Sequence, residues 1–377
     1  MNEWTKVKVG NLGQVITGKT PKTSNREYYG GNIPFLTPSD DMSVKYVRNT
    51  NKYITEAGRL SVKNATIPEN AICVSCIGSD LGKVVITTQE TVTNQQINSV
   101  IVDESKFDID FIYYSMLELG KILNFHSKTS TAVPIVNKSS FSQYEICCPD
   151  FATQKKIGSI LASIDEKIEL NNKINSNLEQ QASALYSEYF SSKSTQDCAT
   201  ATLDEFCEIF TGRKNSNASV PNGKYKFFTC SPEPLLIDSH IYDGNAIIVS
   251  GNGAYTGRTR FYSGKFDLYQ RTYACTLKQH LNDDYIFPLY WFVKLELSKK
   301  IMGGTRGSAI PYIVMNDLAK FEFGFDKAKF EQYMPTFKTI TETIQANENE
   351  NERLASIRDT LLPKLMSGEI DLSNIDI

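Results

Sequence analysis

The feature that most constrains this sequence is an internal duplication. A helical pattern with apolar residues at alternating intervals of three and four runs from Gln154 to Phe190. The same pattern returns 176 residues later, so that Ile164 matches Ile340 and Leu178 matches Leu354. Apolar spacing of this kind predicts long amphipathic helices. The chain should therefore fold as two copies of one unit, each of which ends in a long helix.

Both helices carry a heptad seam, the pattern of a coiled coil rather than of a helix on a broad globular core. The seam positions run from Ile157 to Tyr189 in the first helix and from Phe337 to Leu365 in the second. A buried polar residue in such a seam specifies alignment at some cost in stability. We therefore expect four asparagines, which interrupt the two seams at matching places, to fix the register: Asn171, Asn175, Asn347 and Asn351.

The segments before the helices predict mixed, β-rich domains. Short strand-like runs at 71–77, 84–88 and 98–102 are divided by Gly, Asn and Pro, and helical spacing appears over 109–125. The second copy repeats this order, and the polar run 191–202 before it predicts a linker. The predicted fold class is α+β, with two β-rich mixed domains in tandem repeat. The predicted divisions are 1–150 and 203–325 for these domains, and 151–192 and 326–377 for the helical segments.

Charge and composition exclude several classes of protein. The 377-residue chain has a net charge of −3, and residues 1–150 hold 15 basic and 15 acidic side chains. Residues 201–325 hold 14 and 12, so any basic surface must be local. No apolar run approaches the roughly 18 residues of a membrane span, and Trp4, Lys6 and Lys8 precede no signal-peptide core. We expect a cytoplasmic protein with no membrane partner, whose eight scattered cysteines are reduced thiols.

The catalytic patterns in the sequence are incomplete. Gly13–Thr20 satisfies the P-loop spacing, but no helical periodicity follows Pro21, and the second copy does not repeat the pattern. Cys73 and Cys76 form a CxxC without a second pair or a histidine at ligand spacing. The chain also lacks the Asn/Asp-Pro-Pro-aromatic tetrapeptide of DNA methyltransferases, and no histidine belongs to a nucleophile motif. The sequence predicts no catalytic residue, no metal site and no cofactor in this chain.

Polar turns recur at equivalent places in both copies while their residues differ. Arg and Lys suit guanine or phosphate, Asn and Gln suit adenine, and Gly allows close approach to a phosphate backbone. Ordinary surface turns have a similar composition, but recurrence with altered content favours two readers of different DNA sequences. In the first copy the candidate DNA-binding residues are Lys19, Lys22, Ser79, Lys83, Asn94, Gln95, Lys128 and Thr131. In the second copy they are Arg213, Lys214, Asn252, Tyr255, Arg258, Gln270, Arg271 and Arg306.

A series of motifs in order along the chain points to a family. They are Thr17–Pro21, Tyr28–Leu36, Val74–Lys83, Thr93–Gln95, Cys148-Pro149 before Gln154–Ile157, and Arg358–Ile370. Together they make the chain resemble the specificity (S) subunits of type I restriction-modification systems. The second copy departs from the pattern at Lys226–Thr229, which replaces the Ile-Pro-aromatic-Leu turn of the first.

The resemblance implies two target recognition domains, each of which reads one half of a bipartite, asymmetric site on double-stranded DNA. It also implies that the two helices form an antiparallel coiled coil that holds these domains apart. The partners it implies are two modification subunits, which bind S-adenosylmethionine and methylate adenine, and two restriction subunits, which use ATP and Mg. The competing interpretation is a structural, adhesin-like protein with β-rich heads on a coiled-coil stalk. The basic turns at equivalent places argue against it.

Overall fold

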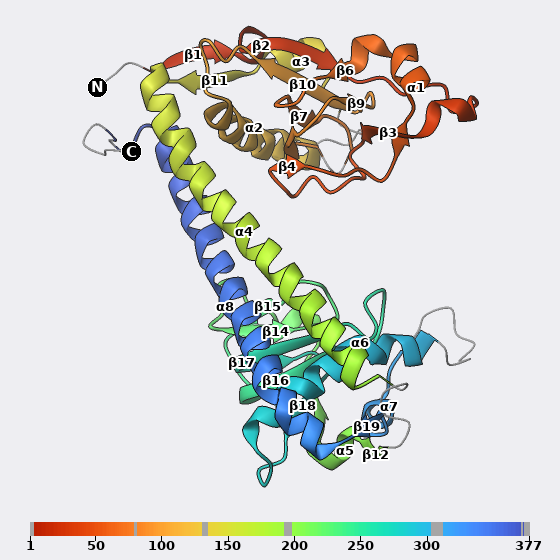
Figure 1. Cartoon of the computed structure of the whole chain (residues 1–377). Helices are drawn as coiled ribbons and strands as arrows, with labels where there is room; N and C mark the ends of the chain where they lie inside the picture. The colour runs from red at the N-terminus through yellow and green to blue at the C-terminus, as the bar shows by residue number, and fades with distance from the viewer. Residues whose placement is uncertain are drawn as a thin grey trace. The chain divides into compact units, whose positions relative to one another are not determined.

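The computed structural model describes residues 4–78, 81–129, 135–191, 198–302, 312–370 and 372. Its chain divides into two compact units. Unit one comprises Met1–Glu169 with Glu352–Ile377, and unit two comprises Leu170–Asn351. The long helices α4 (Phe151–Tyr189) and α8 (Lys327–Met366) each contribute one segment to each unit (Figure 1). No helix of the described residues is long and apolar enough to cross a membrane.

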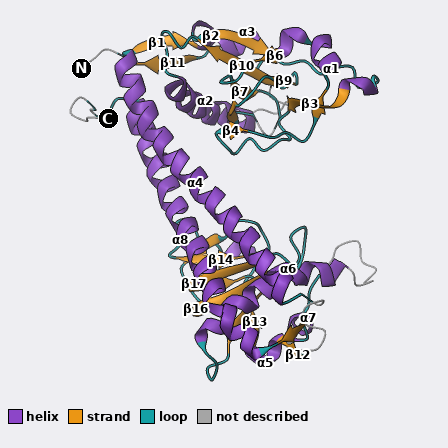
Figure 2. Cartoon of the chain, viewed as in Figure 1, coloured by secondary structure: helices purple, strands orange, loops and turns teal. Residues whose placement is uncertain are grey.

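Unit one combines short strands with three further helices (Figure 2). The helices are α1 (Glu56–Ser61), α2 (Ile109–Thr129) and α3 (Lys138–Gln143). The strands are β1 (Thr5–Lys8), β2 (Gly13–Thr17), β3 (Tyr29–Leu36), β4 (Tyr46–Val47), β5 (Tyr53–Ile54), β6 (Thr66–Ile67), β7 (Ile72–Ser75), β8 (Val84–Thr87), β9 (Thr91–Thr93), β10 (Ile97–Val102) and β11 (Glu145–Cys148).

The central sheet of unit one has the strand order β2-β10-β7-β8-β4 and is covered on both faces. Successive strand residues point to opposite faces. Ile72 and Val74 of β7 accordingly pack with α2, whereas Cys73 packs with Leu36 and Ile67 of the second sheet, β5-β3-β9-β6. The strands pair antiparallel except for β4 with β8 and β3 with β9. Every residue of β7 and β8 is buried, so these strands can present polar groups to a ligand only at their ends.

Unit two is built around one larger sheet with the order β13-β18-β16-β17-β14-β15. Its helices are α5 (Leu203–Phe206), α6 (Ile286–Met302) and α7 (Met315–Ala319). Its strands are β12 (Ala199–Thr202), β13 (Cys207–Thr211), β14 (Tyr225–Phe228), β15 (Leu235–Ile237), β16 (Tyr242–Ser250), β17 (Thr259–Leu268), β18 (Thr272–Leu277) and β19 (Glu322–Phe325). Buried residues of α6, including Trp291 and Phe292, form one core with Ile247 and Val249 of β16.

The structure confirms the duplicated α+β fold strand by strand. The order β2-β10-β7-β8 in unit one corresponds to β13-β18-β16-β17 in unit two. Strand β3 corresponds to β14, since Leu36 pairs in parallel with Thr93 and Phe228 pairs in parallel with Leu268. The antiparallel ribbon β1-β11 likewise corresponds to β12-β19. One prediction was wrong: part of the expected linker 191–202 is strand β12. Its alternating Ala and Thr residues pair with β19, and Ala201 is buried against unit two.

Asparagines join the segments of α4 and α8 that lie in unit two. Asn171, only 1% exposed, donates from Nδ2 to Asn351 Oδ1 at 2.9 Å and to Glu350 Oε2 at 2.7 Å. Asn347 donates from Nδ2 to Asn175 Oδ1 at 2.7 Å. Since partner numbers fall along α8 as they rise along α4, these segments run antiparallel. The four asparagines thus meet one another across the helix pair.

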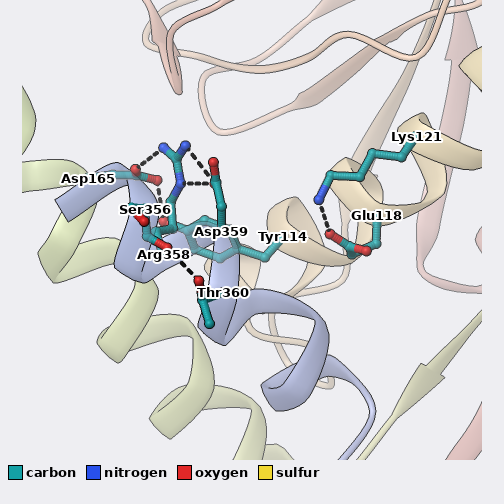
Figure 3. A network of polar contacts seen from close by, with 8 residues as sticks. All are labelled: Tyr114, Glu118, Lys121, Asp165, Ser356, Arg358, Asp359 and Thr360. Atoms are coloured by element: carbon teal, nitrogen blue, oxygen red, sulfur yellow. Dashed lines mark hydrogen bonds and ion pairs between the residues drawn. The ribbon is translucent and has the colours of Figure 1, made fainter. Parts of the chain in front are cut away.

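An ionic network joins α2, α4 and α8 within unit one (Figure 3). Asp165 accepts from the Tyr114 hydroxyl at 2.5 Å and from Arg358 Nη1 at 2.7 Å, and Arg358 Nε donates to Asp359 at 3.0 Å. Burial and the carboxylate of Asp165 raise the pKa of Tyr114. Burial opposes the charge of Arg358, but its bonds to Asp165 and Asp359 outweigh that effect and raise its pKa. The C-terminal motif beginning at Arg358 therefore anchors α8 to unit one.

Replacing Asp165 with alanine should lower the free energy of unfolding by about 2–4 kcal/mol. The change leaves the buried Tyr114 hydroxyl without its acceptor and removes a partner of Arg358. The matched control is alanine at Glu166, the exposed neighbour on the same helix, which should change stability by less than about 0.5 kcal/mol. Urea denaturation followed by circular dichroism measures both. Equal losses in the two variants would contradict the anchoring role.

Candidate nucleic-acid interface

Antiparallel pairing brings most of the candidate residues of unit one to a single edge of the sheet. Thr17 at the end of β2 pairs with Asn98 near the start of β10, and Ile97 pairs with Ser75 at the end of β7. Strand β8 begins beside that end of β7. The turns 18–20 and 94–96, and the described residues 76–78 and 81–83 of a third turn, therefore leave the sheet at the same place. We call these three turns the turn edge of unit one.

Backbone hydrogen bonds lock the three turns together. Lys19 N donates to Thr93 O at 2.8 Å, and Cys76 N donates to Gln96 O at 2.7 Å. The Thr20 hydroxyl adds a bond to Gln95 Oε1 at 2.6 Å. Gly18 is required at this crossing, because a Cβ there would lie 2.1 Å from Asn94 O. The exposed side chains thus project from a fixed backbone.

Unit two has a corresponding turn edge, formed by the turns 212–214, 251–258 and 269–271. Gln270 N donates to Lys214 O at 3.0 Å, and Gly251 N donates to Arg271 O at 2.9 Å. Gly212 repeats the close crossing, since a Cβ there would lie 1.7 Å from Leu268 O. One turn is repeated in detail: Gly82 N donates to Ser75 O and Gly257 N to Ser250 O, both at 2.8 Å.

The turn that follows β7 in unit one and β16 in unit two contains a glycine in the left-handed region in each copy. Gly78 has a φ of 80° and Gly253 a φ of 85°. A Cβ at either position would meet no atom within 4 Å. Glycine is therefore selected here by the backbone angle, and the space above the turn is open to a ligand that approaches the backbone closely.

Exposed candidates occupy matched positions on the two turn edges. Lys19 and Arg213 each follow the crossing glycine, Lys83 and Arg258 each close the long turn, and Gln95 and Gln270 project from the third turn. Arg271 and Tyr255 are also exposed, and the Tyr255 ring lies 5.7 Å from the Arg258 guanidinium. Cationic and amide side chains of this kind bind phosphate oxygens and base edges.

Other candidates lie elsewhere or outside the described part of the chain. Lys22 is exposed, but its carbonyl closes a separate turn with Asn25 N at 3.1 Å. Ser79, Thr131 and Arg306 lie outside the described residues, and only the backbone of Lys128 is described.

Asn94 and Lys214 use their polar side-chain atoms in contacts within the protein. Asn94 is 8% exposed and forms two hydrogen bonds with Gln96. Its Nδ2 donates to Gln96 Oε1 at 2.9 Å, and its Oδ1 accepts from the Gln96 backbone N–H at 3.0 Å. The Lys214 ammonium bonds to Ser239 and, at 2.7 Å, to the buried carboxylate of Asp267. These contacts give Asn94 and Lys214 a role in holding the turns.

A fourth turn joins each turn edge. The sequence marks it as a polar run in both copies, at 37–40 and 229–231, but no residue of it is among the candidates. Asn94 N donates to Leu36 O at 3.0 Å, and Tyr269 N donates to Phe228 O at the same distance. The residues that follow include Asp41 in unit one and Cys230 in unit two. Hydrogen bonds from Ser43 and the charge of Lys83 lower the pKa of the exposed Asp41.

The P-loop and CxxC patterns form ordinary strand structure. Gly13–Thr17 is strand β2 itself, paired with β10. Burial raises the pKa of the Cys73 thiol to about 12 and that of Cys76 to about 11, which disfavours the thiolate that binds metals. Within the described ranges, no group of His, Cys, Asp and Glu side chains is arranged to hold a metal ion.

Comparisons with known proteins point in one direction. The family model of the type I restriction modification DNA specificity domain matches residues 1–180 and 196–354. The type I restriction enzyme HindI specificity subunit of Haemophilus influenzae is 36% identical over 163 residues, which cover 42% of this chain and 35% of that protein. The MjaIX specificity subunit of Methanocaldococcus jannaschii is 24% identical across 99% of this chain and 95% of its own length.

A solved structure shares the fold. The S subunit of a type I restriction-modification system from M. genitalium is 15% identical, and the match covers 97% of this chain and 96% of that one. The TM-score of 0.64 indicates the same overall fold.

Substitutions at the adjacent residues Arg213 and Lys214 should differ in their effect on stability. Lys214→Met should lower the free energy of unfolding by about 1–3 kcal/mol, because it leaves the carboxylate of Asp267 buried without its cation. Arg213→Met, at an exposed position, should change it by less than about 0.5 kcal/mol. Chemical denaturation of the two variants tests the assignment, and equal stabilities would refute it.

Proposed function

Since the chain belongs to the type I restriction-modification DNA specificity family, we propose that each copy reads one half of a bipartite, asymmetric site on double-stranded DNA. Specificity subunits are DNA-recognition components and not enzymes. The observation that supports the proposal best is the repeated turn edge, which carries exposed basic and amide side chains at matched positions on two sheets of the same topology. Membership of this family removes the alternative of an adhesin-like structural protein.

The recognition domains are residues 1–150 and 203–325. Each presents its turn edge to the major groove, where base pairs offer distinct patterns of donors and acceptors. Lys19, Lys83, Arg213 and Arg258 contact phosphate or guanine, while Gln95 and Gln270 read base edges. Because the two turn edges carry different side chains on the same backbone arrangement, the two domains read different half-sites.

The helical segments 151–192 and 326–377 set the distance between the half-sites. The 39 residues of α4 span about 58 Å at 1.5 Å per residue. The asparagine contacts between α4 and α8 fix the register of the pair, since a shift along the seam would separate Asn171 from Asn351 and Asn175 from Asn347. A fixed register makes the helix pair a spacer of constant length.

The same helical segments dock two modification subunits. Residues 326–377 hold 6 basic and 10 acidic side chains, an excess of charge that suits a basic partner surface. The modification subunits bind S-adenosylmethionine and methylate adenine, and two restriction subunits contribute ATP- and Mg-dependent cleavage. The near-neutral balance of the recognition domains means that these partners supply much of the attraction to phosphate.

Alanine at the matched residues Lys83 and Arg258 should affect different halves of the site. In complexes with the modification subunits, Lys83→Ala should alter only the first half of the methylated motif, and Arg258→Ala only the second. A base contact gives relaxed discrimination at one position, whereas a phosphate contact gives a uniform loss of affinity. Sequencing of methylated sites in cells measures the motif. Variants that left both the motif and the affinity for DNA unchanged, or that changed the same half of the motif, would contradict the proposal.

Insertion of one heptad into α4, with a matching heptad in α8, should lengthen the unread spacer by about three base pairs. Seven residues add about 10.5 Å, and base pairs are stacked every 3.4 Å. Both half-sites should remain unchanged. A control insertion of seven residues in the segment 191–198 should leave the spacer as it was. An unchanged spacer after the paired insertion would refute the proposal that the helix pair sets the distance between the half-sites.

A further inference from the structure

A polar pair on the turn edge of unit two has no counterpart in unit one. The Cys230 thiol donates its one proton to Asn252 Oδ1 at 3.0 Å, the nearest of its partners, and lies 3.3 Å from Arg271 O and 3.7 Å from Thr272 Oγ1. Both side chains are partly exposed. Cys230 thereby joins the fourth turn to the turn 251–258 and to the turn 269–271.

The thiol fixes the orientation of the Asn252 amide group. Its Oδ1 accepts a hydrogen bond from Cys230, whereas its Nδ2 amide group has no hydrogen-bond acceptor among the described residues. The backbone is also held, because Asn252 forms a bridge with Tyr312. Beside it, a Cβ on Gly253 would meet no atom within 4 Å, so the approach from outside is open.

Base chemistry then restricts what this amide recognises. Asparagine reads adenine by donating from Nδ2 to N7 while its Oδ1 accepts from the N6 amine. With Oδ1 engaged by the thiol, Asn252 presents a donor. Guanine offers two acceptors, O6 and N7, adenine offers N7 and thymine offers O4, whereas cytosine presents only the N4 donor in the major groove.

We propose that Asn252, oriented by Cys230, determines specificity at one base of the second half-site by donating to guanine O6 or N7, adenine N7 or thymine O4, and rejects cytosine. The inference rests on the proposed function. It names the chemical class of the base that unit two recognises at this position, and it makes Cys230 a positioning residue.

Unit one provides the internal control. Counting from the equivalent carbonyls of Leu36 and Phe228, the residue that matches Cys230 is Pro38. The backbone bridge of Ile77 with Ile135 matches that of Asn252 with Tyr312, so Ile77 stands in the place of Asn252. Neither Pro38 nor Ile77 has a polar side chain. The first half-site must therefore be indifferent to changes in the pair.

The test compares methylated motifs made by full-length variants assembled with the modification subunits. Asn252→Asp replaces the donor by an acceptor, so one position of the second half should change toward cytosine, with a relative methylation shift of about tenfold or more. Asn252→Ala should relax the same position. Cys230→Ser keeps a donor and should keep the parent motif, whereas Cys230→Ala should relax that position again. Cys147→Ser, an exposed cysteine in β11, is the control for thiol loss.

Three results would overturn the inference. The first is a parent motif retained by both Asn252→Asp and Asn252→Ala. The second is a change in the first half. The third is a Cys230→Ala motif that is unaltered while Asn252→Asp alters it, which would remove the orienting role of the thiol. Melting curves measure whether each variant folds. If Asn252→Asp does not fold, the motif of Asn252→Ala tests the role of Asn252.

Failure of the proposed function would look different. If no methylated motif depended on this chain, the proposed function would fail. If a motif depended on the chain and on Arg258 but not on Asn252, only the present inference would fail.

Discussion

The arrangement of this protein depends on sheets whose faces are buried. Every residue of β7 and β8 is buried in unit one, and so are the last five residues of β16 in unit two. A buried face cannot bind a polar polymer, since its side chains are already packed. In these buried strands, polar function must therefore lie at the ends. Antiparallel pairing places the ends of four adjacent strands side by side at one edge of the sheet in each copy. The turns at these ends carry the exposed basic and amide groups.

The two turn edges share their backbone structure and differ in their exposed side chains. Gly18 and Gly212 allow the same backbone crossing, and Gly82 and Gly257 make the same hydrogen bond. Against this constant frame, the tips differ: Ile77 and Pro38 in one copy correspond to Asn252 and Cys230 in the other. A rigid frame places a side chain with little loss of entropy on binding, so a few substitutions suffice to change the bases that are read.

The sequence predicted elements with strong periodicity well and long-range contacts poorly. The seam and its asparagines identified the two long helices, with α4 at Phe151–Tyr189 against a predicted 154–190. The strand β12 escaped notice because Ala and Thr residues beside a polar run resemble a linker until β19 pairs with them. Lys214 was chosen as a candidate for its charge. Its partner Asp267 lies 53 residues away, so spacing alone could not reveal that the charge is used internally.

Amide hydrogen exchange in the assembled complex, with and without its DNA site, tests the central claim most directly. At short labelling times, DNA should slow exchange on the turn edges, at residues 18–20, 76–83 and 94–96 of unit one and at 212–214, 251–258 and 269–271 of unit two. Exchange at the opposite strand ends, residues 88–90 and 103–106, should stay the same. Protection confined to those opposite turns, or to one copy, would contradict reading of DNA by two matched turn edges.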